Sequence, residues 1–324
     1  MSIDPAFPCT APVLAIVIPC FNEQESIPGT LLSLLGVLDK LVSIGRITTE
    51  SFLYFVDDGS TDNTWYLLSS IHKKEHRVRC LKLSRNFGHQ TALIAGLISV
   101  KNKCDISISI DADLQQDPNV MDKFIESYLN GADIVFGVRN NRVADGIFKR
   151  ITALAFYRIM SIMGVTIIKN HADYRLLSKR ALEALTAHNE PNLFLRAICV
   201  QLGFKTGTVY FDVVERNAGV SKYSLRKMLK LAVNGITSFS IFPLRIIAIL
   251  GVLIFGLTAL MAIYVICRTL LVGDTVPGWA STTLPIYFLG GVQVLCIGII
   301  GEYLAEVVNA VKQRPRFIIE TELF

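Results

Sequence analysis

The chain has 324 residues, of which 52% are hydrophobic, and its formal net charge at pH 7 is +5. This length suits one large domain with an appendage, and the apolar content is too high for an ordinary soluble enzyme. The modest charge and the lack of any stacking or groove-reading motif argue against nucleic acid as a partner. The seven cysteines form no CxxC pair and have no histidine at zinc spacing, so we expect them to be reduced, small apolar residues.

Short β-rich runs alternate with helical stretches along the first half of the chain. The runs are LAIVIP (14–19), FLYFVDD (52–58), RVRCLKLS (77–84), DISISIDAD (105–113) and DIVFGVR (133–139). The alternation predicts an α/β fold with a parallel, doubly wound sheet, whose ligands bind beyond the carboxyl ends of the strands. The polar residues at these ends are Asn22, Glu23, Asp57, Asp58, Arg85, Asn86, Asp111, Asp113 and Arg139.

Two acids, Asp111 and Asp113, close the fourth run with one residue between them. Carboxylates this close at the end of a buried strand repel each other unless a cation lies between them. Carboxylate oxygens suit Mg²⁺ or Mn²⁺. Because the chain has neither a GxGxxG after the first strand nor a P-loop sequence, the pattern favours a nucleoside diphosphate held through such an ion. Asp117, directly before Pro118, is instead predicted to be a helix N-cap.

Two stretches of the second half are predicted to be amphipathic helices, one near 146–163 and one at 223–243. In both, apolar residues recur at helical spacing and basic residues lie outside the apolar stripe. Such helices can lie in the plane of the lipid headgroups. A helix that packs on the α/β domain with its polar face in solvent is the alternative.

Two uncharged stretches follow, and each is long enough to cross the ~30 Å apolar core of a bilayer as a helix. The expected transmembrane helices span about 246–268 and 280–301. Basic residues on both outer sides of the pair predict that the α/β domain and both chain ends face the cytoplasm. Residues 1–12 are expected to be an N-terminal tail without signal-peptide character, and 303–324 a cytoplasmic C-terminal tail.

Seven segments of the sequence carry a family resemblance. They are IVIPCFNEQESI, FVDDGSTDNT, LSRNFGHQTALIAGL, DADLQQDP, HADYRLLS, RNAGVSKYS and GEYLAEVVNAVKQRPRFII. Together they resemble the family 2 glycosyltransferases of GT-A fold, and more narrowly the bacterial polyprenyl-phosphate glycosyltransferases, which include the bactoprenol glucosyltransferases. The resemblance runs from about Leu14 to Ile319 and implies a Rossmann-like, mostly parallel GT-A domain at 13–222.

The resemblance also implies roles for residues on the donor side. Asp111, Asp113 and Gln115 match the family's DxDxQ, which holds the divalent metal of the donor diphosphate. Glu23, Asp57 and Asp58 match the positions that bind the nucleoside, where acids accept hydrogen bonds from uracil and ribose. Asn22, Arg85 and Asp111 complete the expected donor-binding set, with an ordinary surface arginine as the alternative for Arg85.

On the acceptor side, Asp173 matches the acid usually assigned to catalysis. The acceptor is a phosphate monoester with a second pKa of about 6, so a general base is hardly needed near neutral pH. A base, a positioning group and a structural partner of Arg175 therefore stay open as roles for Asp173. Ala172 stands where the family usually has glycine, which puts the expected backbone there in question. The candidates for binding the acceptor phosphate are Arg139, Arg150, Arg175, Arg216 and Lys222.

The resemblance implies inverting transfer of a hexose, glucose first, from a UDP-sugar to undecaprenyl phosphate with Mg²⁺ or Mn²⁺. It places the reaction at the cytoplasmic face of a bacterial inner membrane, in a multi-pass homo-oligomer. The lipid-linked sugar would serve O-antigen or other cell-envelope modification, together with a flippase and a downstream glycosyltransferase.

Three alternatives accompany this reading. The donor sugar could instead be GlcNAc, GalNAc, an aminoarabinose type or GDP-mannose, since the motifs do not specify it. A non-catalytic membrane scaffold of the same fold is disfavoured because Asp111 and Asp113 are both present. A processive polysaccharide synthase is disfavoured because the sequence has no QxxRW motif.

Overall fold

The computed structural model describes residues 11–140, 171–188, 195–212, 279–312 and 314–324, together with isolated positions between 247 and 263. These residues belong to two compact units. One unit contains the strands and the helices around them, and the other contains the long helix α10 (Trp279–Val311). The expected amphipathic helices near 146–163 and at 223–243 lie outside the described residues.

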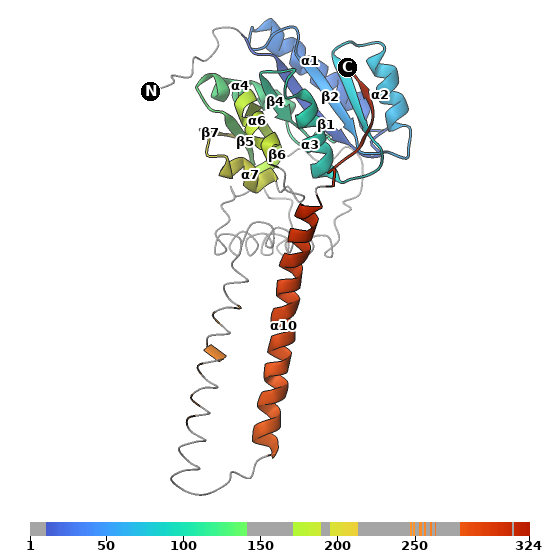
Figure 1. Ribbon diagram of the computed structural model, residues 1–324. Coiled ribbons are helices and arrows are strands. Elements are labelled where there is room, and N and C mark those ends of the chain that lie inside the picture. The colour runs from blue at the N-terminus through green and yellow to red at the C-terminus, as the bar shows by residue number, and fades with distance from the viewer. Residues whose placement is uncertain are drawn as a thin grey trace, which may run out of the picture. The chain divides into compact units, whose positions relative to one another are not determined.

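The described strands form one eight-stranded sheet in the order β7-β5-β6-β4-β1-β2-β3-β8 (Figure 1). The strands are β1 (Leu14–Cys20), β2 (Phe52–Asp57), β3 (Val78–Leu83), β4 (Ile106–Ser109), β5 (Ile134–Arg139), β6 (His171–Ser178), β7 (Thr206–Phe211) and β8 (Ile319–Leu323). Strands β1 to β4 pair in parallel, as do β5 and β7, whereas β6 and β8 run antiparallel to their neighbours. The predicted α/β fold with a mostly parallel sheet is therefore confirmed, and the first five strands lie where the β-rich runs predict them.

Every residue of the central strands β1 and β2 is buried, so both faces of the sheet are covered there. The helices of this unit are α1 (Ile27–Ser43), α2 (Thr64–His72), α3 (His89–Val100), the 3-10 turn η1 (Pro118–Val120), α4 (Met121–Leu129), α6 (Lys179–Ala187) and α7 (Leu195–Gln201). Helix α3 packs closely on β1 and β2. A Cβ on Gly96 would lie 2.5 Å from Val17 Cγ1 and 2.7 Å from Val56 Cγ2. Only glycine lets the helix approach the strands this closely.

Strand β6 lies between β4 and β5 and runs antiparallel to both. It pairs Ser109 with Arg175, and the Ser109 hydroxyl donates a hydrogen bond of 2.6 Å to the Asp173 carbonyl oxygen. In an antiparallel pair, moving two residues forward on one strand matches two residues back on the other. Asp111 and Asp173, 62 positions apart in sequence, therefore meet at the same end of the sheet.

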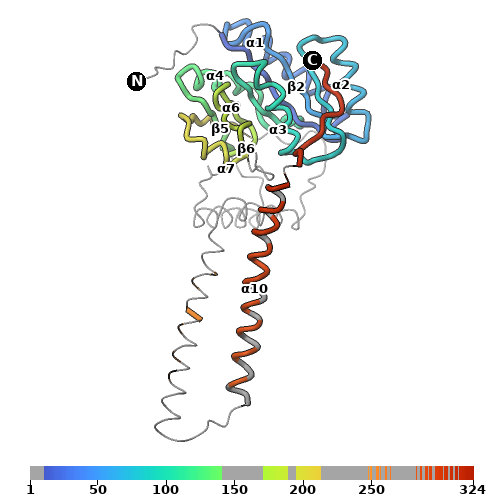
Figure 2. Tube along the Cα trace, in the orientation of Figure 1, coloured from blue at the N-terminus to red at the C-terminus, as the bar shows by residue number. Residues whose placement is uncertain are grey.

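The last residues of the chain form β8 at the edge of the sheet, although 303–324 was expected to be a tail. Figure 2 traces this red segment back beside the N-terminal half of the chain. The Tyr54 hydroxyl donates to Glu322 Oε1 at 2.8 Å, and Lys103 Nζ donates to the same oxygen at 3.0 Å. The Phe324 ring packs against the rings of Phe52 and Tyr54. Both hydrogen bonds and ring packing thus hold the C-terminus on the unit that contains the sheet.

The structure contradicts the prediction of two transmembrane helices. No helix within the described ranges is long and apolar enough to cross a membrane. The prediction relied on the absence of charge from 246–267 and 275–301, and an uncharged stretch is a weaker condition than the sustained apolar length that a bilayer core requires. Most of the first stretch also lies outside the described residues.

Candidate functional site

The loop after β4 folds back on Asp111 through a glutamine. Gln116 Nε2 donates a hydrogen bond of 2.6 Å to Asp111 Oδ2, and its Oε1 accepts one of 3.0 Å from the Asp111 backbone N–H. Gln116 is buried, so these two bonds fix the Asp111 carboxylate firmly. Sequence reasoning missed Gln116 and selected Gln115, whose backbone N–H donates to Asp113 Oδ1 at 3.2 Å. The repeated glutamine was the available signal, because either of the two could face the acid.

Burial raises the pKa of Asp111 above its usual value, and the charges of Asp173 and Asp113 raise it further. A carboxylate in this position gains from a nearby cation. The side chains of Asp111 and Asp113 lie on one loop, which also contains Leu114 with a positive φ of 49°. The expected N-cap is confirmed nearby, because Asp117 Oδ1 accepts a 2.9 Å bond from the Asn119 backbone N–H.

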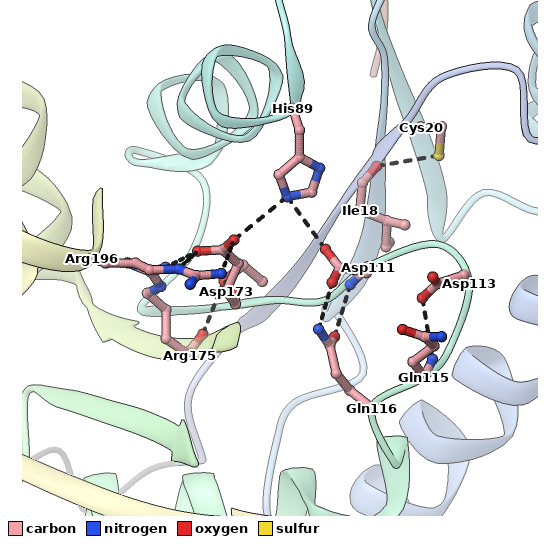
Figure 3. Close-up of polar contacts among 11 residues, drawn as sticks. Ile18, Cys20, His89, Asp111, Asp113, Gln115, Gln116, Asp173, Arg175 and Arg196 are labelled. Atoms are coloured by element: carbon pink, nitrogen blue, oxygen red, sulfur yellow. Dashed lines mark hydrogen bonds and ion pairs between the residues drawn. The ribbon is translucent and has the colours of Figure 1, made fainter. Parts of the chain in front are cut away.

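Asp173 lies in β6 and is clamped by two arginines (Figure 3). Arg175 donates to Asp173 Oδ1 at 2.5 Å. Arg196 donates through Nε to Oδ1 at 3.2 Å and through a terminal nitrogen to Oδ2 at 3.1 Å. Burial would raise the pKa of Asp173, but Arg196 and Arg175 outweigh it and hold the pKa well below the usual aspartate value. Ala172 lies in the same strand without a positive φ, so no glycine is required there.

His89 is a second residue that the sequence did not select. It is the first residue of α3, and its Nε2 lies 3.4 Å from Asp111 Oδ1 and 3.9 Å from Asp173 Oδ2. The imidazole therefore lies between the expected donor-side acid and the expected acceptor-side acid, as Figure 3 shows. Its distance in sequence from both acids, 22 and 84 positions, explains why spacing could not identify it.

Asp58 and Asp57, expected at the nucleoside, are buried at the end of β2. Asp58 accepts hydrogen bonds from the backbone N–H groups of Phe87 (2.7 Å) and Gly88 (2.9 Å), which hold the turn that begins α3. Asp57 Oδ1 accepts from Ser60 N–H at 3.1 Å, while its Oδ2 is buried with no hydrogen-bond partner within the described residues. Burial raises the pKa of both acids. Asp58 thus supports the loop that carries His89, and Asp57 keeps one acceptor oxygen unused.

The other donor-side candidates also contribute to loop structure. Asn22, at φ 55°, accepts from the Thr61 backbone N–H at 2.9 Å. Glu23 Oε2 accepts from the Ser26 hydroxyl at 2.8 Å, at the start of α1. Arg85 is exposed and its guanidinium lies 4.0 Å from the centre of the Phe87 ring. These loops surround the ends of β1, β2 and β3, so their side chains lie at the edge where ligands bind.

The acceptor-phosphate candidates are placed differently. Arg175 is 1% exposed and also donates to the Leu195 carbonyl at 3.1 Å, so its guanidinium is part of the interior. Arg139 ends β5, and its Nε is buried without a hydrogen-bond partner among the described residues. Arg150, Arg216 and Lys222 lie outside the part of the chain that the structure describes. Of the two candidates that the structure describes, Arg175 contacts Asp173.

The described residues contain no cluster of three or more His, Cys, Asp or Glu side chains that would hold a metal by itself. The two acids Asp111 and Asp113 are nevertheless a suitable partial set. Mg²⁺ and similar ions bind through one or two carboxylates plus substrate phosphates, not in an all-protein cage. The raised pKa of Asp111 agrees with a site that gains from a cation.

Residues 15–186 match the family model described as glycosyl transferase family 2. The chain is 49% identical to an uncharacterized glycosyltransferase, YkoT, of Bacillus subtilis, over 97% of this chain and 93% of that protein. It is 37% identical to the SfII prophage-derived bactoprenol glucosyl transferase of Shigella flexneri, over 95% of this chain and 97% of that protein. Among solved structures, the glucosyl-3-phosphoglycerate synthase of Mycobacterium tuberculosis has a TM-score of 0.44 at 17% identity, over 70% of this chain and 78% of that one.

Proposed function

The chain belongs to glycosyl transferase family 2, and from that premise we propose that it transfers glucose from UDP-glucose to a polyprenyl phosphate. The bactoprenol glucosyl transferases match it over nearly their whole length, which supports both the sugar and the lipid acceptor. The observation that carries the proposal is the meeting of Asp111 and Asp173 across β4 and β6, with His89 between them. A donor-side acid and an acceptor-side acid at one sheet end suit the transfer of a group between two substrates.

Asp111 and Asp113 would hold a Mg²⁺ or Mn²⁺ ion together with the donor diphosphate. Both are carboxylates on one loop, and hard oxygen ligands suit these ions. Such an ion, when bound, neutralises the charge that develops on the departing nucleoside diphosphate. Gln116 keeps Asp111 in place through its two hydrogen bonds.

The acceptor reacts through an oxygen of its phosphate monoester. With a second pKa near 6, that phosphate is largely dianionic at neutral pH and needs no base. Asp173 is a poor base in any case, because Arg196 and Arg175 hold its pKa well below the usual value. We therefore assign Asp173 to positioning: it orders two arginines next to the reacting groups.

In this mechanism the phosphate oxygen forms a bond to the anomeric carbon as the bond from that carbon to UDP breaks. Attack from the face opposite UDP inverts the configuration, so an α-linked donor gives a β-linked lipid product. Because the acceptor is a lipid, we place the reaction at the cytoplasmic face of the bacterial membrane. A translocating protein and a second glycosyltransferase would then use the product for cell-envelope glycans.

The test is a panel of radiolabelled UDP- and GDP-sugars offered with undecaprenyl phosphate to the purified full chain. Label should pass into the lipid extract from UDP-glucose, and only when a divalent ion is supplied. Label from GDP-mannose or UDP-GlcNAc at a higher rate would overturn the sugar assignment. Labelling of no lipid by any donor would overturn the proposed reaction.

A further inference from the structure

A threonine on helix α1 holds the loop that carries Asp111 and Asp113. The Thr30 hydroxyl oxygen lies 2.6 Å from the carbonyl oxygen of Ala112, and both residues are buried. Ala112 stands between the two acids in the sequence, so this contact reaches the backbone that joins them. Thr30 and Ala112 are 82 positions apart, and only the fold brings them together.

The hydroxyl of Thr30 donates its proton to Ala112. The Ser26 carbonyl oxygen lies 2.9 Å from the same hydroxyl, but it already accepts a 3.0 Å hydrogen bond from the Thr30 backbone N–H. A hydroxyl has one proton to donate, and two oxygen atoms 2.6 Å apart need a proton between them. Without this donor, the buried Ala112 carbonyl would lose the bond that ties it to α1.

This bond fixes a part of the loop that the glutamine contacts leave out. Gln116 holds the carboxylate and the backbone N–H of Asp111. The Ala112 carbonyl belongs instead to the peptide group that leads into the second acid. Leu114 follows with φ 49°, a conformation that is uncommon for a residue other than glycine and persists where the surroundings hold it. The threonine hydroxyl therefore fixes the backbone between the two acids, and with it the spacing of their carboxylates.

We propose that Thr30 is a positioning residue of the donor's metal site, and that its hydroxyl sets how tightly a divalent ion and a diphosphate bind there. This rests on the proposed function for the ion at Asp111 and Asp113. An ion bound by two carboxylates gains affinity when both are held at the required spacing before it arrives, so residues that orient the ligands contribute to that affinity. Thr30 is 2% exposed and donates to the loop backbone, so it acts through the loop and not as a ligand.

Variants of the purified full chain test this role. Thr30→Val removes the hydroxyl and keeps the branched shape, whereas Thr30→Ser keeps the hydroxyl. Ser51→Ala is the matched control, because it also removes a buried hydroxyl with a backbone partner. The Ser51 hydroxyl accepts a 3.0 Å hydrogen bond from the N–H of Leu14, at the opposite end of β1 from the ligand-binding edge. Thr30→Ala provides a second protein without the hydroxyl in case valine disturbs the folding of α1.

The measurement is a calorimetric titration of UDP, once with Mn²⁺ and once with EDTA, and the ratio of the two affinities is the gain due to the ion. Thr30→Val should lower this gain by on the order of 10-fold, as is typical of losing a residue that orients metal ligands. Thr30→Ser and Ser51→Ala should keep the gain within about twofold of wild type, whatever their effect on Tm. UDP affinity in EDTA should change little in any variant, since the ion takes no part in it. A gain that Thr30→Val leaves unchanged, or that Ser51→Ala lowers equally, would overturn the proposal.

Transfer assays separate this inference from the proposed reaction. If the wild type labels no lipid from any sugar donor, but its UDP affinity gains from Mn²⁺ and Thr30→Val weakens that gain, the reaction fails and the inference stands. If the wild type labels lipid while Thr30→Val keeps the full gain from Mn²⁺, the reaction stands and the inference fails. A wild type whose UDP affinity does not depend on Mn²⁺ sinks the inference independently of turnover.

Discussion

At the scale of single residues, the chemistry of the site depends on which partners the fold gives each acid. Asp173 has two arginines, which keep it ionised and engaged. Asp111 has Gln116 and His89, and burial raises its pKa. Asp173 and Asp111 therefore differ in charge environment, although both are aspartates at the same end of the sheet.

The first prediction concerns Asp173→Asn. Because we assign Asp173 to positioning arginines and not to removing a proton, transfer should fall by roughly 10- to 100-fold, a typical result of misplacing reacting groups. The loss should be the same at pH 6 and pH 8, since the acceptor phosphate ionises by itself over this range. The measurement is the transfer rate against pH at saturating donor, for both proteins. A mutant that recovers tenfold relative to wild type between these pH values would restore Asp173 as the base.

The second prediction concerns His89, which we expect to position Asp111. His89→Ala should raise the Mn²⁺ concentration for half-maximal rate by about 10-fold, the lower end of the effect of losing a residue that orients a metal ligand. His89→Gln retains a hydrogen-bond donor and should lie between the alanine variant and wild type. The readout is a metal titration at fixed substrates. A His89→Ala enzyme with an unchanged metal requirement and a reduced kcat would assign the imidazole to the substrates instead.

At the scale of elements, β8 shows how a strand from the end of the chain stabilises the edge of the sheet. Lys103 and the hydroxyl of Tyr54 both bond to Glu322, and Phe324 lies against the aromatic side chains of β2. Glu320, two residues earlier on the strand, is exposed and pairs only with Lys82 among the contacts of the described chain. Glu322 should therefore contribute more than Glu320 to the free energy of unfolding.

The third prediction compares Glu322→Gln with Glu320→Gln. Glu322→Gln should lower the free energy of unfolding by about 1–2 kcal/mol, because it weakens two charge-assisted hydrogen bonds. Glu320→Gln should cost less than about 0.5 kcal/mol, as is usual for an exposed ion pair. Urea unfolding of each variant measures both. Equal losses would mean that the contacts of Glu322 add nothing beyond a surface pair.

The fourth prediction follows from the charge of Glu322. Burial raises its pKa, but the hydrogen bonds from Tyr54 and Lys103 outweigh this and lower it. A group whose pKa is lower in the folded protein stabilises it above the unfolded-state pKa, and this contribution is lost as the pH falls through the folded value. The gap between wild type and Glu322→Gln should therefore be full at pH 7 and shrink below the ordinary glutamate pKa of about 4.3. A gap that widens in acid would contradict the assignment.

At the scale of the whole molecule, the donor site should couple to folding through its ligand. A ligand present at 100 times its Kd stabilises the folded state by about 2.7 kcal/mol. UDP with Mn²⁺ should therefore raise the Tm of wild type by several degrees. The fifth prediction is that Asp113→Asn abolishes both this shift and sugar transfer while its Tm without ligand stays near wild type. An Asp113→Asn protein that is stabilised as well as wild type would remove Asp113 from the metal site.

The sequence by itself determined the parallel core of the sheet and the acids at its end. The five β-rich runs became β1 to β5. Strands β1, β2 and β5 are apolar along nearly their whole length, as strands buried on both faces require, whereas β3 and β4 alternate apolar with polar residues. Family motifs likewise identified the loop of Asp111 and the segment of Asp173. Local apolar pattern and local motif are both properties of a short stretch, so they can be read without knowing the fold.

Only the tertiary structure decided what surrounds those acids. The antiparallel insertion of β6 brings Asp173 beside Asp111, and α3 and α7 bring His89 and Arg196 to them from 22 or more positions away. The same packing buries Arg175, turns Gln116 and not Gln115 toward Asp111, and makes β8 from an expected tail. These outcomes depend on contacts between distant segments, and the spacing of residues along a chain does not encode which distant side chain will satisfy a buried charge.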